Sequence, residues 1–256
     1  MSNGSNYKGT YLIYHDIVYG AGLGHTMACY NYGLNYSIEQ NMIWVPKKLV
    51  PGHNLNTCGR IFEEELGLPI YTDEHIEDIK KLYNYEEVLK DTQPSSMDFE
   101  KTKPVLNQWY KESRIDKTPM FLNEHKTNIC MSIRRGDLAG KPDHPMFVRL
   151  KPFDYYINVL EDLITTNNID DFRLILSTDL RGHNNCLVDE MNNPHDVSSV
   201  FKKYADDLVF VPFREDEPQE NQFHTFDFFH AAVAADYFIG YIPGGFSEVI
   251  NFIYRQ

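Results

Sequence analysis

Two consecutive arginines, Arg134 and Arg135, stand where the apolar stretch 128–133 (NICMSI) ends, and Gly136 and Asp137 follow them. A guanidinium group is permanently charged and forked, so it can donate two parallel hydrogen bonds to a pair of phosphate oxygens. Gly136 allows the backbone to close around such a ligand. The pattern favours a diphosphate site, and the alternative is a pair of surface charges neutralised by nearby carboxylates.

The overall charge makes this arginine pair more informative. The chain has 256 residues and a formal net charge of -13. Nucleic acids and anionic membranes are bound by basic surfaces, so this composition argues against both as partners. An anionic ligand must therefore be held by a local group of cations.

The loop that follows the arginines, 134–149, is rich in groups that bind anions or move protons. It carries Lys141, Asp143 and His144. A carboxylate or an imidazole in such a loop could act as a general base. A solvated surface loop is the alternative, and it has most weight for Lys141 and Arg149.

Two glycine-containing segments each precede a predicted helix, whose first amides could bind an anion. The first is 20–24 (GAGLG), including Gly22 and Gly24, followed by His25; the second contains Gly244, Gly245, Phe246 and Ser247. The dinucleotide pattern G-x-G-x-x-G is not completed in the first segment, because Met27 occupies its last position. This argues against a nicotinamide or flavin cofactor. For the second segment, a plain turn is the alternative.

Asp179 follows the apolar stretch 172–177. Its carboxylate could accept hydrogen bonds from a ribose or a nucleobase. A helix cap is the other interpretation.

Periodicity predicts alternating strands and helices, which indicate an α/β fold with parallel, doubly wound sheets. The predicted strands are 10–14, 42–45, 128–133, 172–177, 208–211 and 237–240. The predicted helices are 25–40, 61–66, 76–83, 104–113, 152–166, 197–204, 225–235 and 246–254. Ligands of such sheets bind at the carboxyl ends of the strands, where Arg134 and Asp179 are expected. We expect two domains, 1–120 and 121–256.

Together these segments resemble the fucosyltransferase-like superfamily, which includes the alpha-1,2-, alpha-1,6- and protein O-fucosyltransferases. The family motif reads roughly His-x-Arg-Arg-Gly-Asp, and this chain has 132–137 (SIRRGD). The stretches 19–25 (YGAGLGH), 174–179 (LILSTD) and 227–247 are similar to further family motifs. The resemblance covers most of the chain but hardly touches 50–125.

The resemblance implies a GT-B architecture, with two Rossmann-like lobes and a cleft between them. It implies an inverting, metal-independent transfer of a sugar, fucose from GDP-fucose, to a glycan hydroxyl, with no cofactor. The absence of an Asp-x-Asp motif agrees with metal independence. The donor would be bound by the following residues: Gly22, Gly24, His25, Ser132, Arg134, Arg135, Asp179, Gly244, Gly245, Phe246 and Ser247.

Two departures from the family leave the donor sugar open. Ser132 replaces the motif's His, and Gly244-Gly245 stands where relatives often have hydroxyl residues. The alternatives are another donor, such as a xylose or rhamnose nucleotide, or a nucleotide-sugar-binding module without catalysis. The resemblance points to Asp143 as the catalytic base.

Three other residues are alternatives for the base. His144 comes next, and Asp16 and His25 follow.

The N-terminal segment has neither the basic region nor the apolar region that a secretory signal contains. No apolar stretch is long enough to predict a membrane-spanning helix. The four cysteines show no Cys-x-x-Cys spacing. We therefore expect a cytoplasmic protein with reduced cysteines.

Overall fold

The computed structural model describes residues 9–16, 22–46, 60–90, 98–113, 115, 117, 120–135, 138–178, 186–212, 225–241 and 245–255. The chain divides into two compact units: unit 1 comprises residues 1–115 and 252–254, and unit 2 comprises 116–251 and 255–256. The boundary expected from the sequence lies at residue 120. The sequence prediction placed residues 252–254 in the second domain, whereas the structure places them in unit 1.

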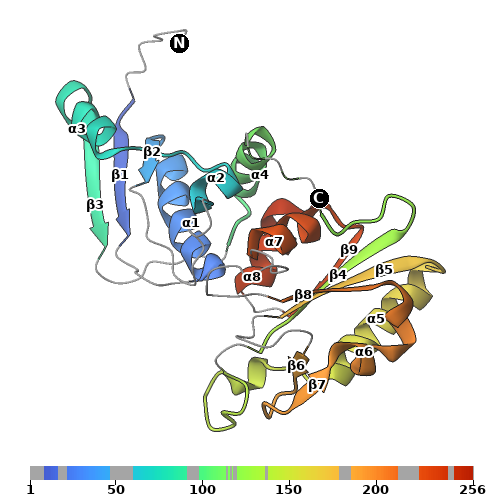
Figure 1. The fold of residues 1–256 in the computed structure, drawn as a ribbon. Helices are drawn as coiled ribbons and strands as arrows, with labels where there is room; N and C mark the ends of the chain where they lie inside the picture. Colours follow the sequence, from blue (N-terminus) through green and yellow to red (C-terminus); the bar gives the residue numbers. More distant parts are fainter. Residues whose placement is uncertain are drawn as a thin grey trace. The chain divides into compact units, whose positions relative to one another are not determined.

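Unit 1 contains a parallel three-stranded sheet in the order β2-β1-β3 (Figure 1). Its elements are β1 (Tyr11–Asp16), α1 (Leu23–Glu39), β2 (Ile43–Pro46), α2 (Phe62–Leu66), α3 (Asp73–Leu82), β3 (Tyr85–Lys90) and α4 (Lys103–Glu112). The α/β pattern predicted for this half is confirmed. Strand β3 was missed, because its sequence YEEVLK lacks the apolar alternation that marks a strand.

Successive side chains of a strand point to opposite faces of the sheet, and in unit 1 a different helix packs against each face. Ile13 and Val45 pack with Ile76 and Ile79 of α3 on one face. On the other face α1 comes very close at Gly33, where a Cβ atom would lie 2.8 Å from the Tyr14 ring. A side chain at position 33 would therefore push α1 away from the sheet.

Unit 2 contains a parallel four-stranded sheet in the order β8-β5-β4-β9 and a small antiparallel hairpin, β6-β7. Its strands are β4 (Thr127–Ile133), β5 (Phe172–Thr178), β6 (Cys186–Val188), β7 (Pro194–Asp196), β8 (Leu208–Pro212) and β9 (Tyr237–Gly240). The four strands predicted for the main sheet are confirmed. The hairpin was missed because each of its strands has only 3 residues.

Helices cover both faces of the unit 2 sheet (Figure 1). They are α5 (Phe153–Asn167), α6 (Val197–Val200), α7 (Thr225–Ala234) and α8 (Gly245–Glu248), with the 3-10 turns η2 (Phe147–Arg149) and η3 (Lys202–Asp207). The π-helical η4 (Val249–Tyr254) follows α8, and its residues 252–254 belong to unit 1. The single helix expected over 197–204 is thus α6 followed by η3. The helix expected over 246–254 is α8 followed by η4.

The main core of unit 2 lies between α5 and the sheet. Ile129, Met131 and Ile133 of β4 are fully buried there against Tyr156 and Leu160 of α5. These β4 residues are two positions apart, as expected for one face of a strand. The opposite face of β4 is left for α7 and α8.

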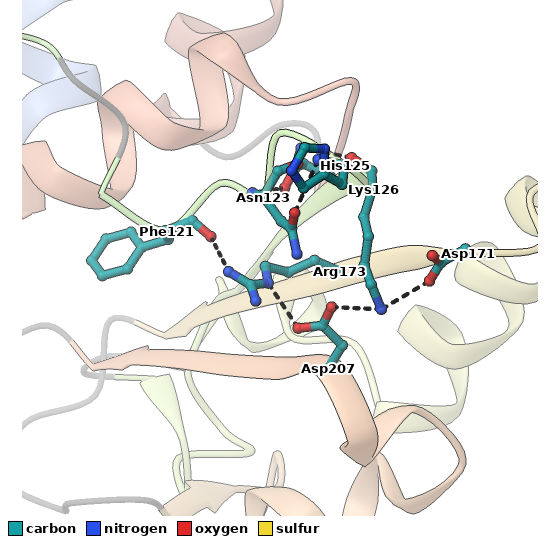
Figure 2. Close-up of polar contacts among 8 residues, drawn as sticks. Phe121, Asn123, His125, Lys126, Asp171, Arg173 and Asp207 are labelled. Atoms are coloured by element: carbon teal, nitrogen blue, oxygen red, sulfur yellow. Dashed lines mark hydrogen bonds and ion pairs between the residues drawn. The ribbon is translucent and has the colours of Figure 1, made fainter.

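Charged side chains gather at the amino end of this sheet, where the strands begin (Figure 2). Lys126 Nζ lies 2.9 Å from Asp171 Oδ1 and 3.0 Å from Asp207 Oδ2. Arg173 donates from Nε to Asp207 Oδ1 at 2.7 Å and from a terminal nitrogen to the Phe121 carbonyl at 3.3 Å. Cations and carboxylates are therefore matched at this edge.

Candidate functional site

The carboxyl edge of the unit 2 sheet is the candidate site, and its topology singles out one position. The chain proceeds from β4 to β5 and β8 on one side, then returns to place β9 on the other side of β4. The strand order therefore reverses between β4 and β9. In open α/β sheets this reversal leaves a crevice at the carboxyl ends of the strands, which is where ligands bind.

Arg134 follows β4 directly at this position. It is half-buried, and its backbone carbonyl accepts a hydrogen bond from Arg135 at 2.7 Å. Ser132 precedes it by two residues and is half-buried, in register with Ser177 of β5 and Gly240 of β9. The extended chain carries Ser132 and Arg134 on the face opposite to Ile133.

Arg135 has a different environment from Arg134. It is fully buried, and its Nε donates to the Val188 carbonyl of β6 at 2.7 Å. Its guanidinium carbon lies 4.9 Å from the centre of the Phe153 ring and 5.9 Å from that of Tyr156. These contacts tie the end of β4 to α5 and to the hairpin, so Arg135 supports the loop from inside the protein.

The loop after the arginines is anchored to the hairpin at Gly140. This glycine has a φ of +74° and donates its amide to the Glu190 carbonyl at 2.9 Å. Asp143 and His144 lie beyond this anchor and are exposed. The His144 ring accepts at Nδ1 from the Met146 amide at 3.1 Å.

Two further cations reach the carboxyl edge at the start of α5. Lys151 Nζ lies 4.8 Å from the centre of the Tyr241 ring, and Tyr241 follows β9. Arg149 interacts electrostatically with Glu248 of α8. Burial raises the pKa of Glu248, and the charge of Arg149 opposes that rise. Within the described part of the chain, neither Arg149 nor Lys151 forms an ion pair.

The end of β5 contributes hydroxyl groups. Ser177 donates to the Val211 carbonyl of β8 at 2.6 Å. Thr178 is only 1% exposed, and its Oγ1 has no hydrogen-bond partner among the described residues. Asp179, the predicted nucleotide-binding carboxylate, lies outside the described residues.

The segment after β9 is packed into the protein. The Phe246 ring stacks on Phe228 with centroids 6.3 Å apart. Ser247 is 5% exposed, and its Oγ would lie 2.4 Å from a Cβ placed on Gly240. Gly245 begins α8, and Gly244 lies outside the described residues. The described contacts of Phe246 and Ser247 are therefore structural, and their expected ligand contacts stay a prediction.

The other predicted binding residues belong to unit 1. Gly22 is the N-cap of α1 with an extended backbone (φ -71°, ψ 170°), and Gly24 is buried in the first turn. His25 is half-buried, and its Nε2 has no hydrogen-bond partner among the described residues.

Sequence reasoning missed a carboxylate and histidine in the β6-β7 hairpin. Asp189 accepts from the Met191 and Asn193 amides, from the Asn193 side chain and from His195 Nε2 at 3.1 Å. Burial alone would raise the pKa of Asp189, but these hydrogen bonds outweigh it and lower the pKa to about 2. The sequence signal that could have identified this pair is the spacing D-x-x-x-N, Asp189 to Asn193, followed by His195.

Comparisons with protein-family models, with curated proteins and with solved structures find nothing that matches this chain. The assignment of the site therefore depends on its residues and geometry alone. Among the described residues, no three His, Cys, Asp or Glu side chains gather as metal ligands would. None of the described helices is long and apolar enough to cross a membrane.

Proposed function

We propose that this chain is a glycosyltransferase that takes a sugar from a nucleotide-diphosphate donor bound at the carboxyl edge of the unit 2 sheet. The observation that carries the proposal is the meeting of Arg134, Arg149 and Lys151 at one edge of a parallel sheet, next to the reversal of strand order. These three cations come from a chain with a net charge of -13. Such a local concentration of positive charge favours a diphosphate over other ligands.

The residues suggest how the leaving group would be stabilised. Charge develops on the diphosphate as the sugar departs, and fixed cations at that position lower the barrier. Arg134 can donate a forked pair of hydrogen bonds. Lys151 can add a point charge, and the Tyr241 ring on which it lies offers a surface for a planar group. Arg135 fixes the loop that carries Arg134.

A base must take the proton of the acceptor hydroxyl. Asp143 and His144 are exposed on the anchored loop, and either can approach an acceptor from solvent. Asp143 is our first choice for this role. An inverting, metal-independent transfer of fucose from GDP-fucose to a glycan is the specific reaction that the sequence resemblance suggests, and xylose or rhamnose donors are the alternatives.

Incubation with a panel of GDP-, UDP- and dTDP-linked sugars, without acceptor, tests the proposal. We expect slow hydrolysis of one donor and stabilisation by its nucleotide of about 2.7 kcal/mol at one hundred times its dissociation constant. Activity should persist in excess EDTA. Binding without hydrolysis or transfer would support the non-catalytic alternative, and no response to any nucleotide would contradict the proposal.

A further inference from the structure

Unit 1 contains a hollow between the ends of α2 and α4 that the proposed reaction does not use. Its volume is about 420 Å³, within the range of small-molecule sites. It is lined by residues from the two helix ends and from the segments that follow them: Glu64, Gly67, Leu68, Ile70, Trp109, Glu112, Ser113 and Ile115. The lining residues therefore include one tryptophan, two glutamates and several apolar residues.

The two helix ends are held together by short contacts. Ser113 Oγ donates to the Glu64 carbonyl at 2.8 Å. Gly67 has a φ of +70°, and a Cβ at this position would lie 2.1 Å from the Trp109 carbonyl oxygen. Only glycine fits there, both for its backbone conformation and for the close approach of α4. These contacts hold the ends of α2 and α4 together on either side of the hollow.

Trp109 is one of the residues that line the hollow. Its indole stacks on that of Trp44, with centroids 5.9 Å apart and an interplanar angle of 7°. Trp44 is 5% exposed and does not line the hollow, so it covers the inner face of Trp109. The outer face of Trp109 is left for a ligand.

The electrostatics of the hollow favour a cation. Glu64 and Glu112 are the charged residues of the lining, which contains no Lys or Arg among the described residues. Helix α4 ends here at Glu112, and the last carbonyl groups of a helix carry partial negative charge. An aromatic face attracts positive charge as well. Carboxylates, helix end and indole therefore all act in the same direction.

We propose that this hollow binds a small organic cation, an ammonium group carried on an apolar body. The ammonium group would lie over Trp109 and between Glu64 and Glu112. The apolar body would contact Leu68, Ile70 and Ile115. Ile70 is 43% exposed in the structure, and such a ligand would cover it. This inference does not depend on the proposed glycosyltransferase function.

Tryptophan fluorescence can report on this hollow, because the chain has 2 tryptophans: Trp109 lines the hollow, and Trp44 stacks on Trp109. Titration with choline should give a saturable change in emission. The neutral isostere of choline, in which a tert-butyl group replaces the trimethylammonium group, should bind at least about tenfold more weakly because it lacks the charge. Glucose serves as a neutral polyol for comparison.

Glu64→Gln and Glu112→Gln should each raise the dissociation constant for choline by about threefold to fivefold, since each removes one charge and little shape. Glu100→Gln is the matched control, an exposed carboxylate of the same unit outside the hollow. Thermal melts of all three variants check that the fold is kept. Equal binding of choline and its isostere, tighter binding of glucose, unchanged affinity in both Gln variants, or no saturable change would each overturn the proposal.

Discussion

The two edges of the unit 2 sheet use their cations differently. At the amino edge, Lys126 and Arg173 are paired with Asp171 and Asp207 at 2.7 to 3.0 Å (Figure 2). At the carboxyl edge, Lys151 lies on an aromatic ring and, among the described residues, has no carboxylate partner. One edge therefore neutralises its charge within the fold. The other keeps the charge of Lys151 available to a ligand.

Stability and nucleotide binding should therefore depend on different edges of the sheet. Changes at the amino edge should lower the free energy of unfolding and leave nucleotide affinity unchanged. Changes at the carboxyl edge should lower nucleotide affinity and leave the free energy of unfolding unchanged. Arg135 is an exception, because it supports the loop from inside the protein. Each variant below tests one side of this division.

Arg134→Ala should have the largest effect. It removes a charge-assisted contact to the leaving diphosphate, so turnover should fall by about 10²- to 10³-fold. Arg134→Lys should recover little of this, because a point charge cannot reproduce the fork. Turnover of the preferred donor and the melting temperature should be measured for both variants. Turnover close to that of the unmodified protein in a folded alanine variant would contradict the role of Arg134.

Asp143→Asn should reduce turnover by about 10²-fold and leave nucleotide affinity nearly unchanged, because the amide keeps the shape and loses the basicity. His144→Ala is the companion variant. Steady-state rates and nucleotide titrations distinguish them. If turnover collapses only in His144→Ala, the base is His144, and if it survives in both, the base lies elsewhere.

Asp189→Asn should lower stability without changing nucleotide affinity, although Asp189 lies in the hairpin beside the carboxyl edge. Hydrogen bonds hold its pKa at about 2, below the unfolded value near 4, so its contribution is present above pH 4 and lost as the pH falls to about 2. Because Asp189 is only partly shielded from solvent, the variant should be less stable by about 1 kcal/mol at neutral pH.

Denaturant melts between pH 7 and pH 2 check this. The variant should lack the part of the acid-induced loss that belongs to Asp189. Curves for the two proteins that stay parallel across this pH range would show that the hydrogen bonds to Asp189 contribute nothing.

Asp207→Asn should cost about 1 to 2 kcal/mol of stability, since it leaves Lys126 and Arg173 without their shared carboxylate. Burial alone would raise the pKa of Asp207, but hydrogen bonds from these two cations hold it below its usual value. Nucleotide affinity should not change. A weaker affinity for nucleotides at unchanged stability would remove the distinction between the edges.

Much of the fold could be predicted from the sequence, because β4, β5, β8 and β9 are apolar runs bounded by polar segments. Strand β3 could not, since it is held by backbone pairing with β1 and its residues Tyr85, Glu86 and Glu87 are exposed. Short strands such as β6 and β7 carry too few residues for a period to show.

The candidate site was predictable only in part. The position of Arg134 followed from the end of an apolar run. The packing of Arg135 against α5 also had a signal, because 129, 131 and 133 form the face of β4 that packs against α5 and 135 continues that alternation. The contact of Lys151 with Tyr241 had none, since it joins residues ninety positions apart through the topology of the sheet.

We propose that the carboxyl edge of the unit 2 sheet binds a nucleoside diphosphate. Calorimetric titration of GDP, with UDP and dTDP alongside, tests it most directly in three proteins: the unmodified chain, Arg134→Ala and Arg173→Ala. We expect saturable binding of one nucleotide, weakened at least about tenfold by Arg134→Ala. Arg173→Ala should lower stability and keep that affinity. Equal loss of affinity in both variants, or no binding of any nucleotide by the unmodified chain, would contradict the account.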